Sequence, residues 1–186
     1  MQDEEKLSKM RALELWDKNI IGEFEVGTYK GLQAIHHYLF QDVFDFAGKT
    51  RTVNIAKGNF RFAPVLFLES NLAIIDKMPE STFEEIIDKY VEMNIAHPFR
   101  EGNGRATRIW LDLILRKRLG LCVDWAKVDK NDYLSAMERS PVNTLELRHL
   151  LKQALTENAN DRQVYLRGIQ QSYYYEDMGE VDVHEL

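Results

Sequence analysis

The stretch His97-Pro98-Phe99-Arg100-Glu101-Gly102-Asn103-Gly104-Arg105-Ala106-Thr107-Arg108 combines a titratable base, a carboxylate, two glycines and a pair of arginines three residues apart. Pro98 disfavours the α conformation at His97, so a helix that arrives from Phe83 is expected to end there. The imidazole would then be exposed at a helix-to-loop corner. This places a group that can accept a proton beside a loop rich in backbone donors.

The second half of the stretch predicts a phosphate site. Gly102-Asn103-Gly104 can turn tightly and direct backbone and side-chain amides at one point, and the apolar run 109–115 predicts a helix behind them. Arg105 and Arg108 are three residues apart at the start of that helix, so both guanidinium groups can clamp the same anion. Two clamps favour a ligand with more than one phosphate.

The twelve residues resemble, at every defined position, the pattern His-Pro-Phe-x-(Asp or Glu)-Gly-Asn-Gly-Arg-x-x-Arg of the Fic family. The resemblance implies a mainly α protein, a Fic-type helical bundle with one small β-hairpin flap, in which residues 1–186 form a single Fic domain. It also implies a protein adenylyltransferase that moves AMP from ATP to a Tyr, Thr or Ser hydroxyl with Mg²⁺. The similarity extends over most of residues 28–176.

The chemistry of AMP transfer needs a base, a cation and donors for the charge on the phosphoryl oxygens. His97 suits the base, because its usual pKa of about 6.5 leaves a neutral imidazole near pH 7. Glu101 suits Mg²⁺, which prefers one or two carboxylates plus substrate phosphates. In the family, the arginine at the position of Arg108 engages the γ-phosphate.

Residues 49–64 predict a β-hairpin around a Gly58-Asn59 turn, since apolar and polar residues alternate on both sides of it. A lone hairpin is marginally stable, so it is expected to be either a mobile flap or a structural excursion. The resemblance implies the flap, on which the target protein docks by strand addition. Lys57 matches the flap position that approaches the nucleotide.

Further helices are expected around the motif. Ser81 and Glu84 have the spacing of a capping box for the helix that delivers His97. Residues 130–139 predict another helix, on which Leu134 and Met137 either wall the adenine, as the resemblance implies, or pack in the core. Residues 156–160 have the composition of a linker.

The C-terminal segment resembles that of compact Fic proteins with an inhibitory helix, here residues 161–176. Ser172 and Glu176 match the inhibitory (Ser or Thr)-x-x-x-Glu motif, and four-residue spacing places them on one face. Docked on the site, Glu176 would pair with Arg108 in the place of the γ-phosphate. The alternative is a plain amphipathic terminal helix.

Two features follow this motif. Asp177 departs from the family pattern, which has Gly or Asn there; Asp tolerates the left-handed conformation but adds a negative charge. The acidic tail 177–186 is expected to fray. Tyr173 is the first choice for self-modification by AMP, unless the C-terminal tyrosines simply pack.

Composition restricts the partners. A net charge of −6 and the absence of a long basic run disfavour nucleic acid and anionic membrane surfaces. The single Cys122 excludes an internal disulfide and fits a reducing compartment, so a cytoplasmic protein is expected. The adjacent His36 and His37 point in different directions on a helix, which favours structural or surface roles over a shared metal.

Other functions remain open from the sequence. The enzymatic alternatives are removal of AMP from a modified protein and transfer of another phosphate-containing group. The non-enzymatic alternative is a toxin-like binding module that depends on a partner chain. A homo-oligomer is also compatible with the sequence.

Overall fold

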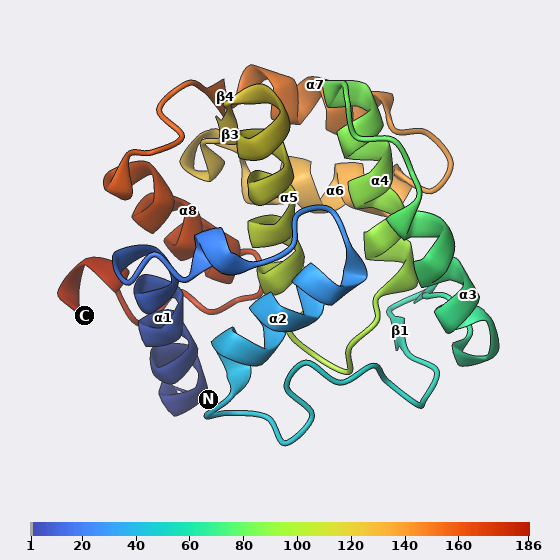
Figure 1. Ribbon diagram of the computed structural model, residues 1–186, viewed down its shortest axis with the longest axis horizontal. Helices are drawn as coiled ribbons and strands as arrows, with labels where there is room; N and C mark the ends of the chain where they lie inside the picture. The colour runs from blue at the N-terminus through green and yellow to red at the C-terminus, as the bar shows by residue number, and fades with distance from the viewer. Residues whose placement is uncertain (1) are drawn as a thin grey trace.

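Helix α5 (Asn103–Leu119) lies at the centre of the molecule and packs against α4 (Phe83–Ala96), α2 (Tyr29–Phe40) and α8 (Arg162–Tyr174) (Figure 1). The computed structural model describes residues 2–186. The other helices of this range are α1 (Gln2–Asp17), α3 (Val65–Asp76), α6 (Lys130–Arg139) and α7 (Leu145–Gln153). Residues 2–186 also contain three short 3₁₀ turns, at Ile21–Glu23, Trp125–Lys127 and Val183–Glu185. The predicted mainly α fold is confirmed.

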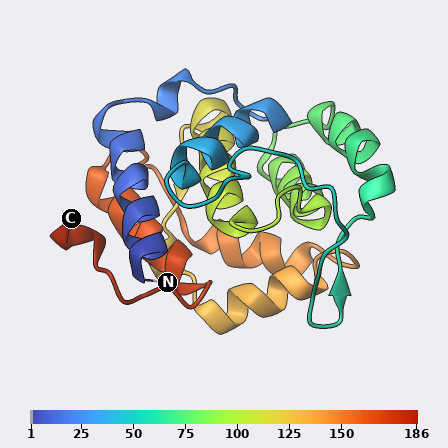
Figure 2. The same cartoon turned by 90° about the horizontal axis from the view of Figure 1, so that it is seen from below.

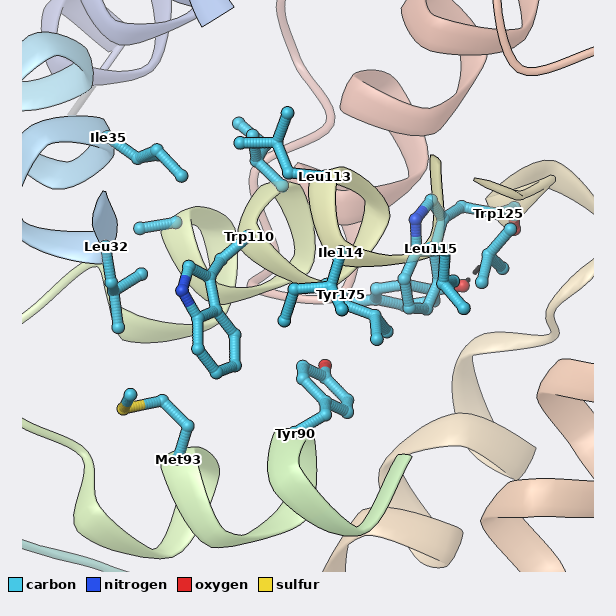
Figure 3. Close-up of a cluster of buried hydrophobic side chains, with 14 of the residues drawn as sticks. Leu32, Ile35, Tyr90, Met93, Trp110, Leu113, Ile114, Leu115, Trp125 and Tyr175 are labelled. Carbon is cyan, nitrogen blue, oxygen red and sulfur yellow. Dashed lines mark hydrogen bonds between the residues drawn. The ribbon is translucent and has the colours of Figure 1, made fainter. Parts of the chain in front are cut away.

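The apolar residues of α5 form the middle of the core. Trp110 points between Leu32 of α2 and Met93 of α4, and its indole Nε1 donates a hydrogen bond of 2.9 Å to the Thr28 carbonyl (Figure 3). Because Trp110 is fully buried, that hydrogen bond satisfies the one polar group of its side chain. Residues from all eight α-helices of the described range belong to one hydrophobic cluster, so each helix is held against the same core.

Local signals begin and end the helices that carry the motif. The capping box of α4 is formed by Thr82 and Glu85, one residue later than predicted, because the Thr82 hydroxyl accepts the Glu85 N–H while the Glu85 carboxylate accepts the Thr82 N–H. Helix α5 is bounded by Gly102 before it and Gly120 after it, both in the left-handed conformation. Half of the motif is therefore helical, whereas a turn preceding the helix was expected.

Two small strand pairs complete the fold. The predicted hairpin is formed by β1 (Ala56–Lys57) and β2 (Phe60–Arg61), which pair antiparallel, and it projects from the helical body (Figure 2). A second pair joins β3 (Cys122–Val123) and β4 (Leu155–Thr156). The prediction of a linker at 156–160 is therefore wrong at its first residue, since Thr156 belongs to β4.

The C-terminal tail is docked, contrary to the prediction that it frays. Val183 is buried, and the carboxylate of Glu5 accepts hydrogen bonds from the backbone N–H groups of Glu180 and Val181. Lys9 donates to the Val181 carbonyl at 2.5 Å. Figure 2 shows the two chain ends on the same side of the molecule, which places α1 where it can hold the tail. Met1 lies outside the described residues.

No helix within residues 2–186 combines the length and the apolar character that a bilayer crossing requires.

Candidate active site

A cavity of about 830 Å³ lies between the hairpin, the motif loop, α6 and the end of α8. Its lining includes all ten residues that were predicted for catalysis, nucleotide binding and metal binding, together with Glu176. These residues are His97, Glu101, Gly102, Asn103, Gly104, Arg105, Arg108, Lys57, Leu134 and Met137. The structure thus gathers residues from distant parts of the chain at one opening.

His97 lies at the corner predicted for it. Helix α4 ends at Ala96, and His97 takes the left-handed conformation with φ 46° and ψ 64°. Its ring is half-buried rather than exposed as predicted, because Phe62 of the hairpin stacks on it at 3.6 Å between ring centroids. Burial lowers the pKa of His97 to about 4, so the imidazole is neutral at pH 7 and able to accept a proton.

The N-terminus of α5 forms an anion site opposite His97. The first N–H groups of α5 have no acceptor within the helix, and the helix dipole adds partial positive charge. A side chain at Gly104 would collide with the Glu176 carboxylate, so the close approach of that anion requires glycine. The side chain of Asn103, which was predicted to contribute its amide, accepts a hydrogen bond from the Phe99 backbone N–H at 2.9 Å and donates one to the Phe99 carbonyl at 2.7 Å.

Arg108 binds the C-terminal helix through three hydrogen bonds. Its Nε donates to the Ser172 hydroxyl at 2.7 Å, and Nη2 donates to the Ser172 carbonyl and to Glu176 Oε1, both at 2.9 Å. Burial opposes ionisation of Glu176, but Arg108 outweighs it and lowers the pKa of that carboxyl below its usual value. Ser172 and Glu176 therefore share a face directed at Arg108, as their spacing predicted.

Arg105 has a different environment. Its guanidinium lies 4.7 Å from the ring centre of Phe40 and 5.3 Å from that of Tyr173, and Nη2 is 3.5 Å from the carboxylate of Glu4. It is almost fully buried, with Nε and Nη1 free of hydrogen bonds within residues 2–186. Arg105 and Arg108 thus contact different groups, and only Arg108 bonds Glu176.

Glu101 provides an exposed carboxylate at the cavity. Within the described range there is no group of three or more His, Cys, Asp or Glu side chains that could enclose a metal ion. A single carboxylate beside an anion site suits Mg²⁺, which takes its other ligands from water and substrate phosphates. The donor set therefore fits a cation that arrives with a phosphate ligand.

The hairpin and α6 form the remaining walls. Lys57 Nζ lies 3.8 Å from Glu176 Oε2, so the hairpin is in contact with the same carboxylate that binds Arg108. Leu134 is partly buried and Met137 is buried, and both line the cavity on α6. An apolar wall opposite a phosphate site is able to cover a flat base.

The prediction that Tyr173 is the self-modified residue is wrong for this conformation. Tyr173 is 1% exposed and its hydroxyl is buried, so the phenol oxygen cannot reach a phosphorus atom at the cavity. Its neighbour Tyr174 is 48% exposed. The three consecutive tyrosines alternate between buried and exposed positions. Because the residues are identical, the sequence could not show which of them is exposed.

Several residues at the site were missed by the sequence analysis. Tyr133 on α6 bonds Tyr90 through their hydroxyls, and its ring lies 5.6 Å from the Arg108 guanidinium. Lys130 forms an ion pair with Asp177 at 2.5 Å, which offsets the extra negative charge expected there. The sequence placed Tyr133 and Lys130 on a helix, but it did not indicate that they would contact Tyr90, Arg108 and Asp177.

A sequence profile of the Fic/DOC family matches residues 27–115. The protein adenylyltransferase VbhT of Bartonella schoenbuchensis is 33% identical over 175 residues, which cover 87% of this chain and 35% of VbhT. The probable protein adenylyltransferase Fic of Salmonella typhimurium is 30% identical over 138 residues, 68% of each chain. This chain therefore spans about a third of VbhT and about two thirds of the Salmonella protein.

Solved structures give the same picture of the fold. BepC, a VirB-translocated effector protein of Bartonella tribocorum with bound AMPPNP, matches with a TM-score of 0.67 and 20% identity over 81% of this chain and 83% of that chain. The N-terminal Fic domain of a putative cell filamentation protein of Bartonella quintana, with bound ADP, has a TM-score of 0.64 and 18% identity over 87% and 85%. At these identities the likeness shows the fold alone.

Proposed function

Because this chain belongs to the Fic/DOC family, we propose that it transfers the AMP moiety of ATP to a hydroxyl group of a target protein. One observation carries the proposal: a neutral imidazole, a carboxylate and the open N-terminus of α5 line a single cavity. Relatives named protein adenylyltransferase support the same activity.

The residues perform distinct tasks in this reaction. His97 takes the proton from the attacking hydroxyl, whose oxygen forms a bond to the α-phosphorus while the bond to the leaving pyrophosphate breaks. The first N–H groups of α5 and the Arg108 guanidinium stabilise the negative charge on the phosphates. Glu101 would hold Mg²⁺, which would supply positive charge that stabilises the phosphates.

We also propose that Glu176 inhibits the transfer. Its carboxylate lies against Gly104 at the N-terminus of α5 and accepts a hydrogen bond from Arg108. This is the position expected for the terminal phosphate of ATP. Tethering gives this carboxylate a high effective concentration at the site. The hydrolytic removal of AMP is the second candidate function, because the same carboxylate lies at the cavity and could orient a water there.

The hairpin is the proposed docking site for the target. Its strands are two residues long and mostly exposed, so their free edges can pair with an extended peptide. Phe62 connects this edge to His97, which would place a docked hydroxyl near the base. Self-modification, if it accompanies the transfer, is proposed for the exposed Tyr174 rather than Tyr173.

The proposal is tested by incubating the chain with labelled ATP, Mg²⁺ and a cell lysate. His97→Ala should abolish labelling of protein, by about 10²–10⁴-fold or more, while ATP binding persists, since the imidazole acts on the hydroxyl and not on the nucleotide. His149→Ala, at an exposed histidine on α7, is the matched control and should label normally. Labelling by His97→Ala at the wild-type rate would refute the role of the base.

A further inference from the structure

Arg51 lies outside the motif, in the segment between α2 and the hairpin, and is 3% exposed. Its guanidinium donates four hydrogen bonds, and all four acceptors are backbone carbonyl groups. The distances are 2.7 Å to His97, 2.8 Å to Val53, 2.5 Å to Ala63 and 3.0 Å to Ala96. A buried charge is here satisfied by main-chain dipoles alone.

These carbonyls belong to the two parts of the site that must act together. Ala96 ends α4 and His97, the base, follows it, whereas Val53 precedes β1 of the hairpin and Ala63 follows β2. The backbone strengthens the connection, because the Arg51 N–H bonds the Pro98 carbonyl at 2.8 Å and the Ala63 N–H bonds the Ile95 carbonyl at 3.0 Å. Arg51 is thus the junction between the base and the flap.

The His97 backbone needs this support. His97 has φ 46°, and a residue other than glycine in this left-handed conformation is strained and persists only where its surroundings hold it. The carbonyl of His97 is held by Arg51, and its ring is held by Phe62, which directly precedes the Ala63 carbonyl that Arg51 also binds. Loss of Arg51 would loosen both supports of the imidazole.

The guanidinium is suited to this task by its shape. It is planar and presents five N–H donors in a rigid fork, so it can hold several carbonyls at fixed angles. Lysine retains the charge but offers three donors on a flexible stem. Arg51→Lys therefore keeps the positive charge but removes the planar set of donors, so it tests whether the geometry of the hydrogen bonds matters.

We propose that Arg51 is a positioning residue for AMP transfer, which holds His97 and the flap as one rigid unit so that a hydroxyl docked on the flap meets the base. This inference rests on the proposed function. It assigns Arg51 to the placement of the base and the hydroxyl, and it leaves nucleotide binding to α5 and Arg108. A displacement of about 1 Å between reacting groups can lower a rate about 100-fold.

The test compares Arg51→Lys and Arg51→Gln with a control, Arg148→Lys. Arg148 is a half-buried arginine on α7 that pairs with Asp88 of α4, and neither residue lines the cavity. Each of the three substitutions is made in the wild-type chain and in the Glu176→Gly chain, so that the Glu176 carboxylate does not mask a change in the rate of AMP transfer. Arg51→Lys should unfold cooperatively, transfer AMP about 10–100-fold more slowly, and keep the KM for ATP within about twofold. The control should keep the parent rate.

A second measurement does not depend on activity. Hydrogen exchange at the Ala63 amide, which bonds Ile95, should quicken in Arg51→Lys and stay slow in the control. If the parent chain transfers nothing, the proposed function fails, and the exchange rates still decide whether Arg51 joins the flap to the His97 corner. Unchanged exchange overturns the inference. Three other outcomes also overturn it. Arg51→Lys transfers AMP at the parent rate, it loses rate and ATP affinity in proportion, or both Arg51 variants lose cooperative unfolding.

Discussion

At the scale of single residues, His36 is a buried histidine that holds the motif loop. Its Nδ1 accepts the Gly48 N–H at 2.9 Å, so the proton must be on Nε2, which donates to the Glu101 carbonyl at 2.8 Å. The ring stacks on Phe99 at 3.8 Å. The prediction of a structural role for His36 agrees with these contacts, and they connect α2 to the backbone of the proposed metal ligand.

His36→Phe should raise the Mg²⁺ concentration needed for half-maximal transfer several-fold. Phenylalanine can keep the stack on Phe99 but leaves the Glu101 carbonyl without its donor, so the carboxylate is held less firmly. The measurement is a Mg²⁺ titration of the transfer rate. His37→Phe, at the exposed neighbouring position, is the control. A titration curve identical to that of the wild type would show that the loop does not need His36.

At the scale of elements, the end of α8 is a well-defined helix terminus placed on the site. Asp177 takes the left-handed conformation with φ 60°, and the Met178 N–H bonds the Tyr173 carbonyl at 2.9 Å, the pattern of a Schellman motif. The expectation that Asp is tolerated there is confirmed. Lys130 pairs with Asp177, so α6 helps to place Glu176 at Arg108.

Glu176→Gly should raise the rate of AMP transfer, by about 5–150-fold if the coupling has the usual size of 1–3 kcal/mol. The change removes the carboxylate that competes for Arg108 and for the N-terminus of α5. Transfer rates are compared over a range of enzyme concentrations, with Glu157→Gly in an exposed loop as the control. Equal rates for wild type and Glu176→Gly would mean that this helix does not inhibit.

At the scale of the whole molecule, α1 connects the two chain ends to the site. Lys9 and Glu5 bind the tail, and Glu4 approaches Arg105 at the cavity. The buried Val183 fixes the tail beyond α8. Helix α8 and the residues that follow it are therefore held on both sides, by Arg108 at the site and by α1 through the tail.

The free energy of unfolding should decrease as the pH falls from about 7 to 5. Burial lowers the pKa of both His36 and His97 to about 4, so between pH 6.5 and 4 the unfolded chain binds more protons than the folded one. The free energy of unfolding therefore decreases as the pH falls through this window, and the contribution of the two histidines is fully lost at its lower end. His36 alone should contribute about 2 kcal/mol between pH 7 and 5.

Urea unfolding at each pH measures this change. His36→Phe lacks the titrating group and should show a shallower dependence, whereas His37→Phe should follow the wild type. Parallel curves for all three chains would contradict the low pKa of His36.

Features that depend on near neighbours in the chain could be predicted from the sequence. Periodicity placed α6 at residues 130–139, the Gly58-Asn59 pair placed the hairpin turn, and the pattern from His97 to Arg108 indicated the base, the carboxylate and the anion site. These signals are strong because helix spacing and turn conformation are set within about four residues.

The contacts between distant groups could not be predicted and became visible in the folded chain. Nothing in the sequence indicated the partners of Arg51 and His36, since their carbonyl partners are up to 65 residues away. The burial of Tyr173, the β3–β4 pair and the docked tail likewise depend on packing against other elements. The physical reason is that periodicity reports which face of an element is apolar, whereas the partner of a polar group is set by where the folded chain places the remaining elements.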